Sequence, residues 1–401
     1  YSPAIADFNN DGKYELLLGR KDYACLDAYY YETSPNPNMI YNNYFCNSNN
    51  AYDDRKNIWN ISKTSGTNIV GGPYIGGNYW SDYAGADVNG DGIGDTLLPY
   101  NCSGNIQNRG DWLPLISNII YVDDDFNEST PGWGFDHFDK IQDGINAVAE
   151  NGTVYVFKGI YYENVIVNKT INLIGESKNT TIIDGMGNGI GIRITADYVN
   201  ISNFKIINTT WSYPGIRIDS SYNNISNCNI STFIELDHAT HNYVKNNIAV
   251  TISLDNSLYN HILNNIIANI GVGYSNYNII SENILNGGMI ALLRSNHNNI
   301  SHNTIRDSPD DYGAIYIHGN SDYNNISENS IHNVKCGIYM IESWAGSDND
   351  YNKILNNLIV CKNISYSYGI YIDYENDNNT ICGNTIYNAI GYGIALFSEI
   401  M

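Results

Sequence analysis

The sequence predicts an all-β protein, a right-handed parallel β-helix with a short capping helix at its start and small calcium-binding β modules before it. Asn and Ile together make up 122 of the 401 residues, with 64 Asn and 58 Ile. Asn competes with the helical backbone and Ile favours strands. A short phrase also recurs about every 20 residues, as in stacked solenoids.

The charge balance excludes one class of partner. Lys and Arg number 20 against 42 Asp and Glu, so the formal net charge is −22. Nucleic-acid binding depends on clustered basic residues, and we therefore expect no nucleic-acid partner. No run of 18 apolar residues occurs, so we expect no membrane span in this sequence. Because it starts at Tyr1 and not at Met, we expect a mature fragment or a piece of a longer chain.

The repeats define the rod over residues 119–401. The phrase Ile-Ser-x-Asn-x-Ile, in strict or looser form, begins at Ile225, Val244, Ile262, Ile280, Ile300, Ile326, Ile354 and Ile381. Its fourth position is Asn in all of these copies except the first, where Cys228 stands. An Asn repeated at one point of every coil predicts a ladder of stacked amides that bond successive turns.

A second phrase, Gly-Ile-x-Ile, alternates with the first. Strand alternation turns its two apolar side chains inward and its middle residue outward. The outward residues Tyr316, Tyr339 and Tyr371 then form an exposed aromatic column. Such a column stabilises neighbouring strands, and it is also a candidate glycan-binding surface.

The rod is expected to open with a helix that covers its first coil. Ile141, Ile145 and Val148 have the spacing of one helix face. Asp139 and Gln142 indicate an N-cap with its partner three residues on, and Gly152 is expected to end the helix before a strand at 153–157.

Residues 1–35 and 36–118 look like two smaller modules that each carry a calcium loop. Oxygen-bearing side chains alternate along both loops and a Gly stands at the sixth position, the arrangement that suits a hard cation. Neither loop has the Glu at position twelve that binds through both oxygens, since Leu18 and Leu98 stand there. The candidate calcium ligands are Asp7, Asn9, Asp11 and Glu15 in the first loop and Asp87, Asn89, Asp91 and Asp95 in the second.

These stretches also resemble known families. Residues 2–19 resemble part of one FG-GAP propeller-blade repeat. Residues 120–401 are similar to the β-helix repeats of NosD-type surface proteins, and Gly-Asn-Tyr-Trp-Ser-Asp-Tyr at 77–83 is similar to the closing segment of archaeal members. In that segment Trp59, Trp80 and Trp112 are expected to be core or cap aromatics. The resemblance implies an archaeal cell-surface protein.

Motifs for catalysis are weak. The Asn-Thr-Asp stretch of inverting glycosidases with this fold does not occur, and the pairs Asp53-Asp54 and Asp310-Asp311 stand without their usual neighbours. Seven histidines, from His238 to His332, lie among the repeats of the rod, and a copper or zinc site among them is an alternative to scattered turn residues. The seven cysteines form no CxxC pair and fit small buried fillers.

The predicted function is that of a non-enzymatic extracellular structural or cell-surface protein, with calcium as its cofactor and self-association into a layer, sheath or filament as an open hypothesis. Two alternatives stay open: a protein that binds or cleaves polysaccharide, as a lyase or glycoside hydrolase, and a periplasmic metal-handling protein. Export also implies glycosylation at Asn-x-Ser/Thr sites. The candidates are Asn60, Asn101, Asn127, Asn168, Asn200, Asn224, Asn299, Asn325 and Asn363.

Overall fold

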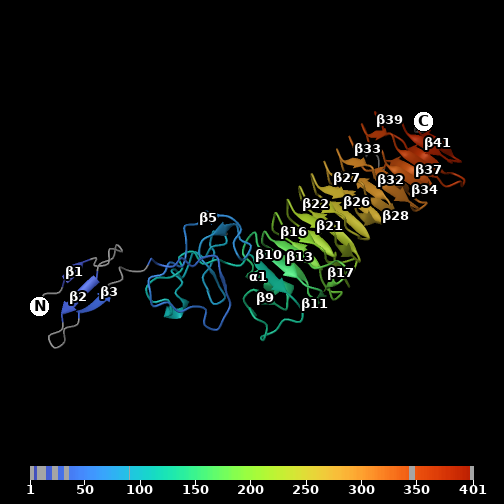
Figure 1. Ribbon diagram of the computed structural model, residues 1–401. Coiled ribbons are helices and arrows are strands. Elements are labelled where there is room, and N and C mark those ends of the chain that lie inside the picture. Colours follow the sequence, from blue (N-terminus) through green and yellow to red (C-terminus); the bar gives the residue numbers. More distant parts are fainter. Residues whose placement is uncertain are drawn as a thin grey trace. The chain divides into compact units, whose positions relative to one another are not determined.

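The computed structural model describes residues 4–6, 15–19, 26–30, 36–89, 91–342 and 348–397. The chain divides into two compact units, Tyr1–Ile116 and Ser117–Met401, which are treated separately below. Figure 1 shows the coils of the second unit stacked in sequence order, from α1 and β10 to β41. The predicted division of the first unit at residue 35 stays a prediction.

The first unit contains short strands joined by long connections. The strands β1 (Ala4–Ala6), β2 (Glu15–Gly19) and β3 (Leu26–Tyr30) form an antiparallel sheet. Farther along, β4 (Tyr44–Phe45) pairs in parallel with β7 (Tyr79–Trp80), and β5 (Thr64–Ser65) pairs antiparallel with β6 (Tyr74–Ile75). A 3-10 turn spans Cys102–Gly104. The predicted ligands Asp7, Asn9 and Asp11 lie outside the described residues, and Glu15 begins β2.

Aromatic rings make the core of this unit. Trp80 is fully buried, and its ring centroid lies 5.4 Å from that of Trp59 and 4.9 Å from that of Tyr100. Phe45 stacks on Trp80 at 4.6 Å. Trp59 and Trp80 are therefore core residues, as predicted, whereas Trp112 is 56% exposed.

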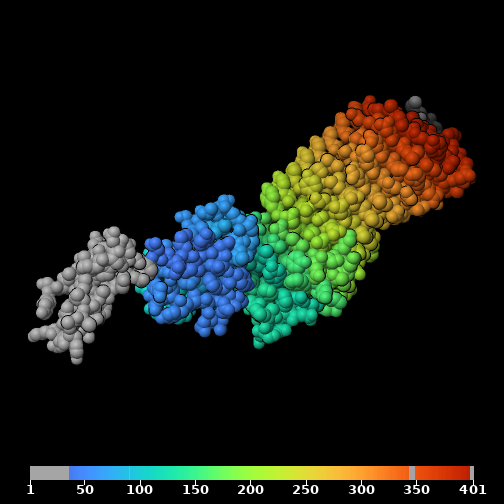
Figure 2. Space-filling model, in the orientation of Figure 1, coloured from blue at the N-terminus to red at the C-terminus, as the bar shows by residue number. Residues whose placement is uncertain are grey.

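The second unit is a right-handed parallel β-helix, as predicted, and its coils pack into one continuous body in the space-filling view (Figure 2). Each coil contributes strands to three faces. The first face is a sheet of thirteen strands. They are β8 (Ile119–Val122), β9 (His137–Phe138), β10 (Thr153–Val156), β13 (Asn172–Gly175), β16 (Asn200–Ser202), β19 (Asn224–Ser226), β22 (Tyr243–Lys245), β24 (His261–Leu263), β27 (Ile279–Ser281), β30 (Asn299–Ser301), β33 (Asn325–Ser327), β36 (Lys353–Leu355) and β39 (Thr380–Cys382).

The second face has two sheets, connected by single bridges through Ile248. Its strands are β11 (Gly159–Tyr162), β14 (Thr181–Asp184), β17 (Lys205–Ile207), β20 (Asn229–Ile230), then β25 (Ile266–Ile267), β28 (Ile284–Asn286), β31 (Thr304–Arg306), β34 (Ser330–Val334), β37 (Leu358–Cys361) and β40 (Thr385–Tyr387).

The third face is a sheet of eleven strands, and it carries the candidate site. Its strands are β12 (Val165–Val167), β15 (Ile192–Ile194), β18 (Ile216–Ile218), β21 (Phe233–Asp237), β23 (Thr251–Asp255), β26 (Asn269–Gly273), β29 (Ile290–Leu293), β32 (Gly313–His318), β35 (Cys336–Ile341), β38 (Tyr368–Ile372) and β41 (Tyr392–Leu396).

The repeat phrase sets the register of the first face. Ile201 pairs with Ile225, Ile225 with Val244, and Val244 with Ile262, and all four side chains are fully buried. Because every coil places a β-branched side chain at this point, the apolar rows stack into one dry core. The Asn and Ile excess in the composition follows from this repetition.

The predicted asparagine ladder is present. Asn265 is buried, and its side-chain amide donates to the Oδ1 of Asn283 at 3.0 Å and to the carbonyl of Val244 at 2.9 Å. A second ladder on another turn was not predicted. It runs through Asn223, Asn242, Asn260, Asn278, Asn298, Asn324, Asn352 and Asn379, each accepting from the backbone N–H of the preceding coil's ladder position.

The capping helix exists, but its predicted N-cap is wrong. The helix α1 spans Ile141–Ala147, with Lys140 at the N-cap position and no side-chain bond from that residue. The carboxylate of Glu163 instead accepts from the backbone N–H groups of Ile141 at 2.8 Å and Gln142 at 2.9 Å. The helix also ends before Gly152. Since the capping group is 22 residues away, the local pattern around Asp139 could not reveal it.

Candidate functional site

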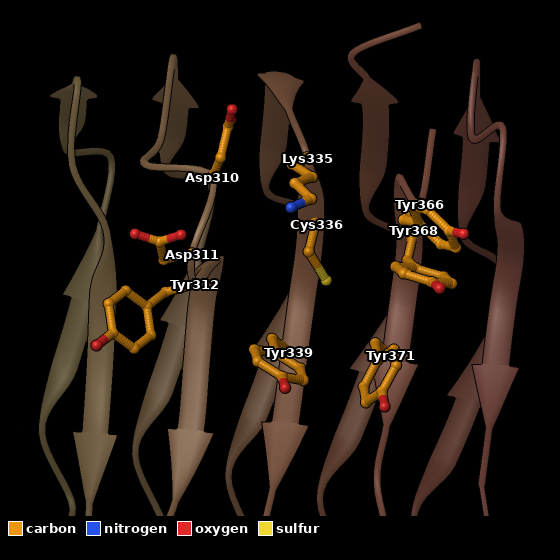
Figure 3. A pocket seen from close by; sticks show the side chains of 9 residues that line it. All are labelled: Asp310, Asp311, Tyr312, Lys335, Cys336, Tyr339, Tyr366, Tyr368 and Tyr371. Carbon is orange, nitrogen blue, oxygen red and sulfur yellow. The ribbon is translucent and has the colours of Figure 1, made fainter. Parts of the chain in front are cut away.

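The loops that lead into three strands of the third face form a hollow of about 280 Å³. Asp310, Asp311 and Tyr312 precede β32, Lys335 precedes β35, and Tyr366 precedes β38. Figure 3 shows these side chains and those of Cys336, Tyr339, Tyr368 and Tyr371 along the same opening. Five of the nine lining residues are tyrosines, so the hollow is predominantly aromatic.

The predicted tyrosine column forms part of this hollow. Strand register pairs Tyr316 with Tyr339 and Tyr339 with Tyr371. Their ring centroids are 5.7 and 4.9 Å apart, and the second pair meets edge to face at 82°. The three rings are half-buried where the prediction had them exposed. Tyr339 and Tyr371 line the hollow, whereas Tyr316 packs on His318 at 4.5 Å.

The hydroxyl groups of this column are neutral, and burial moves their pKa values above the ordinary value of 10. Burial raises the pKa of Tyr339 to about 12, and it raises the pKa of Tyr371 and Tyr316 as well. A neutral phenol both donates and accepts hydrogen bonds. The hollow therefore offers ring surfaces with neutral hydroxyl groups at their edges.

The charged groups of the hollow are of both signs. Asp310 accepts from Lys362 Nζ at 2.5 Å, and Lys335 and Asp311 lie in the same lining. Cys336 is buried, and burial raises the pKa of its thiol, so it behaves as an apolar wall residue.

A second aromatic row, which the sequence reasoning missed, runs along another turn of the rod. It consists of Tyr198, Tyr222, His241, Tyr259, Tyr277, His297, Tyr323 and Tyr351, with neighbouring centroids 4.8 to 5.1 Å apart and ring planes within 20°. Each ring face is covered by the next ring, which leaves mainly edges for solvent. The signal was available, because a Tyr or His stands directly before most Asn residues of the second ladder. This row stabilises the stack of coils.

The described part of the second calcium loop forms a tightly hydrogen-bonded turn. Asp87 accepts from the N–H groups of Asp91 at 3.1 Å and Gly92 at 2.6 Å. Asp95 accepts from the N–H groups of Val88 and Asn89, and Asp91 forms an ion pair with Lys63. The carboxylates thus face the loop backbone, and calcium binding there stays a prediction.

Two other groups of carboxylates lie close enough together to hold a metal ion. They are Asp123, Asp124 and Asp125, and Glu342, Asp348 and Glu375. In the described part of the chain, no histidine or cysteine belongs to a group of three such ligands. Oxygen-only sets suit hard cations, whereas copper prefers imidazole and sulfur. The described residues therefore do not fit a copper centre.

The candidate glycosylation residues are all at least partly accessible. Asn101, Asn127, Asn168, Asn200 and Asn363 are exposed, and Asn60, Asn224, Asn299 and Asn325 are half-buried. Asn325 donates its amide to Asn299 Oδ1 at 2.9 Å, so that pair already uses its side chains within the sheet. Glycosylation stays a prediction.

Fold and site together define a parallel β-helix protein with an aromatic hollow on one face. The family model described as periplasmic copper-binding protein (NosD) matches residues 26–85 and 229–360, just under half of the chain, and confirms the predicted likeness to NosD-type repeats. The FG-GAP-like part and the archaeal source stay predictions. No curated protein sequence matches the chain.

Three solved structures illustrate the fold. The Dettilon tailspike protein is 13% identical with a TM-score of 0.45, and the match covers 67% of this chain and 61% of that one. The AlgE6 A-module, a mannuronan C-5 epimerase from Azotobacter vinelandii, is 15% identical with a TM-score of 0.42 over 65% and 91% of the chains. An alginate lyase from Paenibacillus sp. str. FPU-7 is 12% identical with a TM-score of 0.41 over 64% and 95%. None of the described residues belongs to a helix with the length and apolar character needed to cross a membrane.

Proposed function

We propose that this chain is a non-enzymatic protein of the cell surface or extracellular space that binds polysaccharide in the tyrosine-lined hollow of its β-helix. The observation that carries the proposal is the convergence of Tyr312, Tyr339, Tyr366, Tyr368 and Tyr371 on one opening. Sugar rings present apolar C–H faces and many hydroxyl groups. Tyrosine matches both features, since it has an apolar ring and a polar tip.

The rings of the hollow are oriented better for sugar binding than the rings of the second aromatic row, from Tyr198 to Tyr351, which is the outer row. Tyr371 meets Tyr339 at 82° and Tyr368 at 73°, so these rings stand at steep angles, although Phe397 also lies against Tyr371 at 4.8 Å. In the outer row, by contrast, each ring lies flat against the next. A sugar needs an open ring face, and steeply angled rings leave more of each face uncovered than flat stacking does.

The charges around the hollow favour an uncharged polysaccharide as the ligand. Asp310 and Asp311 lie in the lining with one cation, Lys335, and Asp310 is already paired with Lys362, while the chain as a whole carries a formal charge of −22. A uronate polymer would meet repulsion from both. The same carboxylates accept hydrogen bonds from sugar hydroxyls, as polar groups in glycan sites commonly do.

Replacing Tyr339 and Tyr371 by Ala is expected to weaken binding of neutral oligosaccharides at least ~10-fold, because the loss of an aromatic platform costs about 1–3 kcal/mol. Isothermal titration with β-glucan, mannan and chitin oligomers measures the change. Tyr277→Ala, which removes a ring from the outer row, serves as the matched control and should leave the affinity unchanged. Equal loss in the control, or no binding by the unmodified chain, would reject the proposal.

Calcium binding by the loop at 87–95 is part of this proposal, because bound calcium would fix the turn for exposure outside the cell. Adding a chelator to calcium-saturated protein is expected to lower the stability of the first unit by about 2–3 kcal/mol, the amount for ligand at ~100 times its dissociation constant. Thermal unfolding with and without chelator measures it. In Asp87→Ala the chelator should have a smaller effect, and an unchanged melting temperature in the unmodified chain would exclude a structural ion.

Self-association into a layer or filament remains a separate hypothesis. Light scattering and negative-stain images of the purified chain with calcium would test it, and dispersed monomers would contradict it.

A further inference from the structure

A hollow of about 530 Å³ in the first unit combines positive charge with amide groups. It is lined by Asn36, Pro37, Asn38, Arg55, Lys56, Asn57 and Arg109. Three of its seven lining residues are basic and none is acidic, in a chain where acidic residues outnumber basic ones by about two to one. Such a concentration of positive charge is unexpected from the composition and needs a physical reason.

The three cations have no bonding partner among the described residues. Arg55, Lys56 and Arg109 are exposed, and none forms an ion pair or side-chain hydrogen bond with the residues that the structure describes. Some other described cations do pair with carboxylates, such as Arg217 with three acids and Lys362 with Asp310. The charges at this hollow are therefore available to an anion in solution.

The backbone beneath the hollow is firmly held. The buried carboxylate of Asp53 accepts from the Arg55 N–H at 2.9 Å, the Asn57 amide at 3.0 Å and the Trp59 indole at 2.8 Å. Asn108 donates its amide to the carbonyl of Asp54 at 2.8 Å. The Asn108 bond, together with backbone bonds from Asp53 to residues 105 and 107, connects the segment that carries Arg55 and Lys56 to the segment that carries Arg109. The backbone positions from which the three cations extend are therefore set before any ligand arrives.

A second hollow adjoins the first and shares Arg109. It measures about 580 Å³, and its lining includes Trp112, Gln107 and Asn108. Trp112 is 56% exposed, unlike the buried Trp59 and Trp80. The shared arginine thus has amide groups and an accessible indole on one side and two further cations on the other.

From this arrangement we infer a binding site for an acidic polysaccharide, in which uronate carboxylates meet Arg55, Lys56 and Arg109 and a sugar ring lies on Trp112. Guanidinium groups match carboxylates with two parallel hydrogen bonds, and the amides suit hydroxyl groups. The two hollows are of a size that accommodates ligands larger than one small anion. The ligand differs in charge from that of the tyrosine-lined hollow, so either site can be present without the other.

The test uses the full chain and an oligogalacturonate of ten residues as the probe. At 50 mM salt, isothermal titration is expected to show binding that weakens as the salt concentration rises, because exposed charges are screened. Arg109→Gln is expected to weaken it ~10-fold or more, the usual effect of losing a charge-assisted bond. Arg55→Gln and Lys56→Gln are expected to give smaller losses in the same direction.

Three comparisons keep this test specific. Arg306→Gln removes an exposed arginine from the rod and lowers the net charge equally, and it should bind as the unmodified chain does. The methyl ester of the same oligomer has no charge and should bind at least ~10-fold more weakly. Tyr339→Ala should leave oligogalacturonate binding intact, which separates this site from the proposed neutral-glycan site.

The proposal would be overturned by any of three results. These are no oligogalacturonate binding at 50 mM salt, equal affinity in Arg109→Gln and Arg306→Gln, or binding only to a phosphate polymer such as polyglycerol phosphate. The last result would show that the cations recognise phosphate and not uronate.

Discussion

Replacing Asn283 by Ala is expected to destabilise the β-helix by about 3–5 kcal/mol, as a buried group with several hydrogen bonds is lost together with its volume. Asn283 is fully buried. Its Oδ1 accepts from the backbone N–H of Asn265 at 2.9 Å and from that residue's amide at 3.0 Å. Its own amide donates to the carbonyl of Ile262 at 2.8 Å and to Asn303 Oδ1 at 3.0 Å.

Most of the stability lost in Asn283→Ala comes from the buried hydrogen-bonding partners of Asn283, which lose their bonds. Alanine cannot replace these bonds, and the N–H of Asn265 and the carbonyl of Ile262 would stay buried without them. The effect should extend to the neighbouring coils, because solenoid stability depends on interfaces between adjacent repeats.

Urea unfolding followed by circular dichroism, with hydrogen exchange on peptides from residues 260–305, measures this loss. Asn286→Ala provides the matched control, since Asn286 is exposed at the end of β28. That variant should stay within about 0.5 kcal/mol of the unmodified chain. Similar stabilities for the two variants would mean that the ladder contributes little to the fold.

Much of the rod could be predicted because one residue type serves one structural purpose in every coil. The spacing of Ile and Asn defined the inward rows and one amide ladder without knowledge of distant contacts. The second ladder was not predicted. Its residues recur just before the same phrase in successive coils, as in Tyr222-Asn223 and Tyr277-Asn278, so the signal was present in the sequence.

The features that escaped prediction depend on residues far apart in the chain. Glu163 caps a helix that begins at Ile141, and no local pattern connects the two. The tyrosine-lined hollow lies where the repeat steps lengthen from 20 to between 26 and 28 residues, so the longer loops were detectable but their convergence was not. The basic hollow combines Arg55 with Arg109, which only the folded first unit brings together.

The second large effect is expected at Asp111, the buried carboxylate of the first unit. Its Oδ2 accepts from the backbone N–H of Asn78 at 2.6 Å and the indole of Trp80 at 2.9 Å, and its Oδ1 accepts from the N–H of Leu113 at 3.0 Å. Burial nevertheless raises its pKa from 3.8 to about 6, because removal from water outweighs these donors. The folded unit therefore holds a proton that the unfolded chain has already released between about pH 4 and pH 6.

This shift makes the first unit lose stability as the pH rises. Where the folded state binds more protons than the unfolded state, the free energy of unfolding falls with increasing pH, here by roughly 3 kcal/mol between pH 4 and pH 6. Below pH 4 the contribution is complete, and above pH 6 it is gone.

The variant Asp111→Asn keeps the shape of the side chain but cannot ionise. The stability of the unmodified chain relative to this variant should therefore fall by that amount from pH 4 to pH 6. Hydrogen exchange on peptides from residues 74–83, compared between the two proteins at each pH in urea, measures the difference. A constant difference from pH 4 to pH 6 would show that Asp111 keeps an ordinary pKa, and that the donors of Asn78, Trp80 and Leu113 compensate fully for its burial.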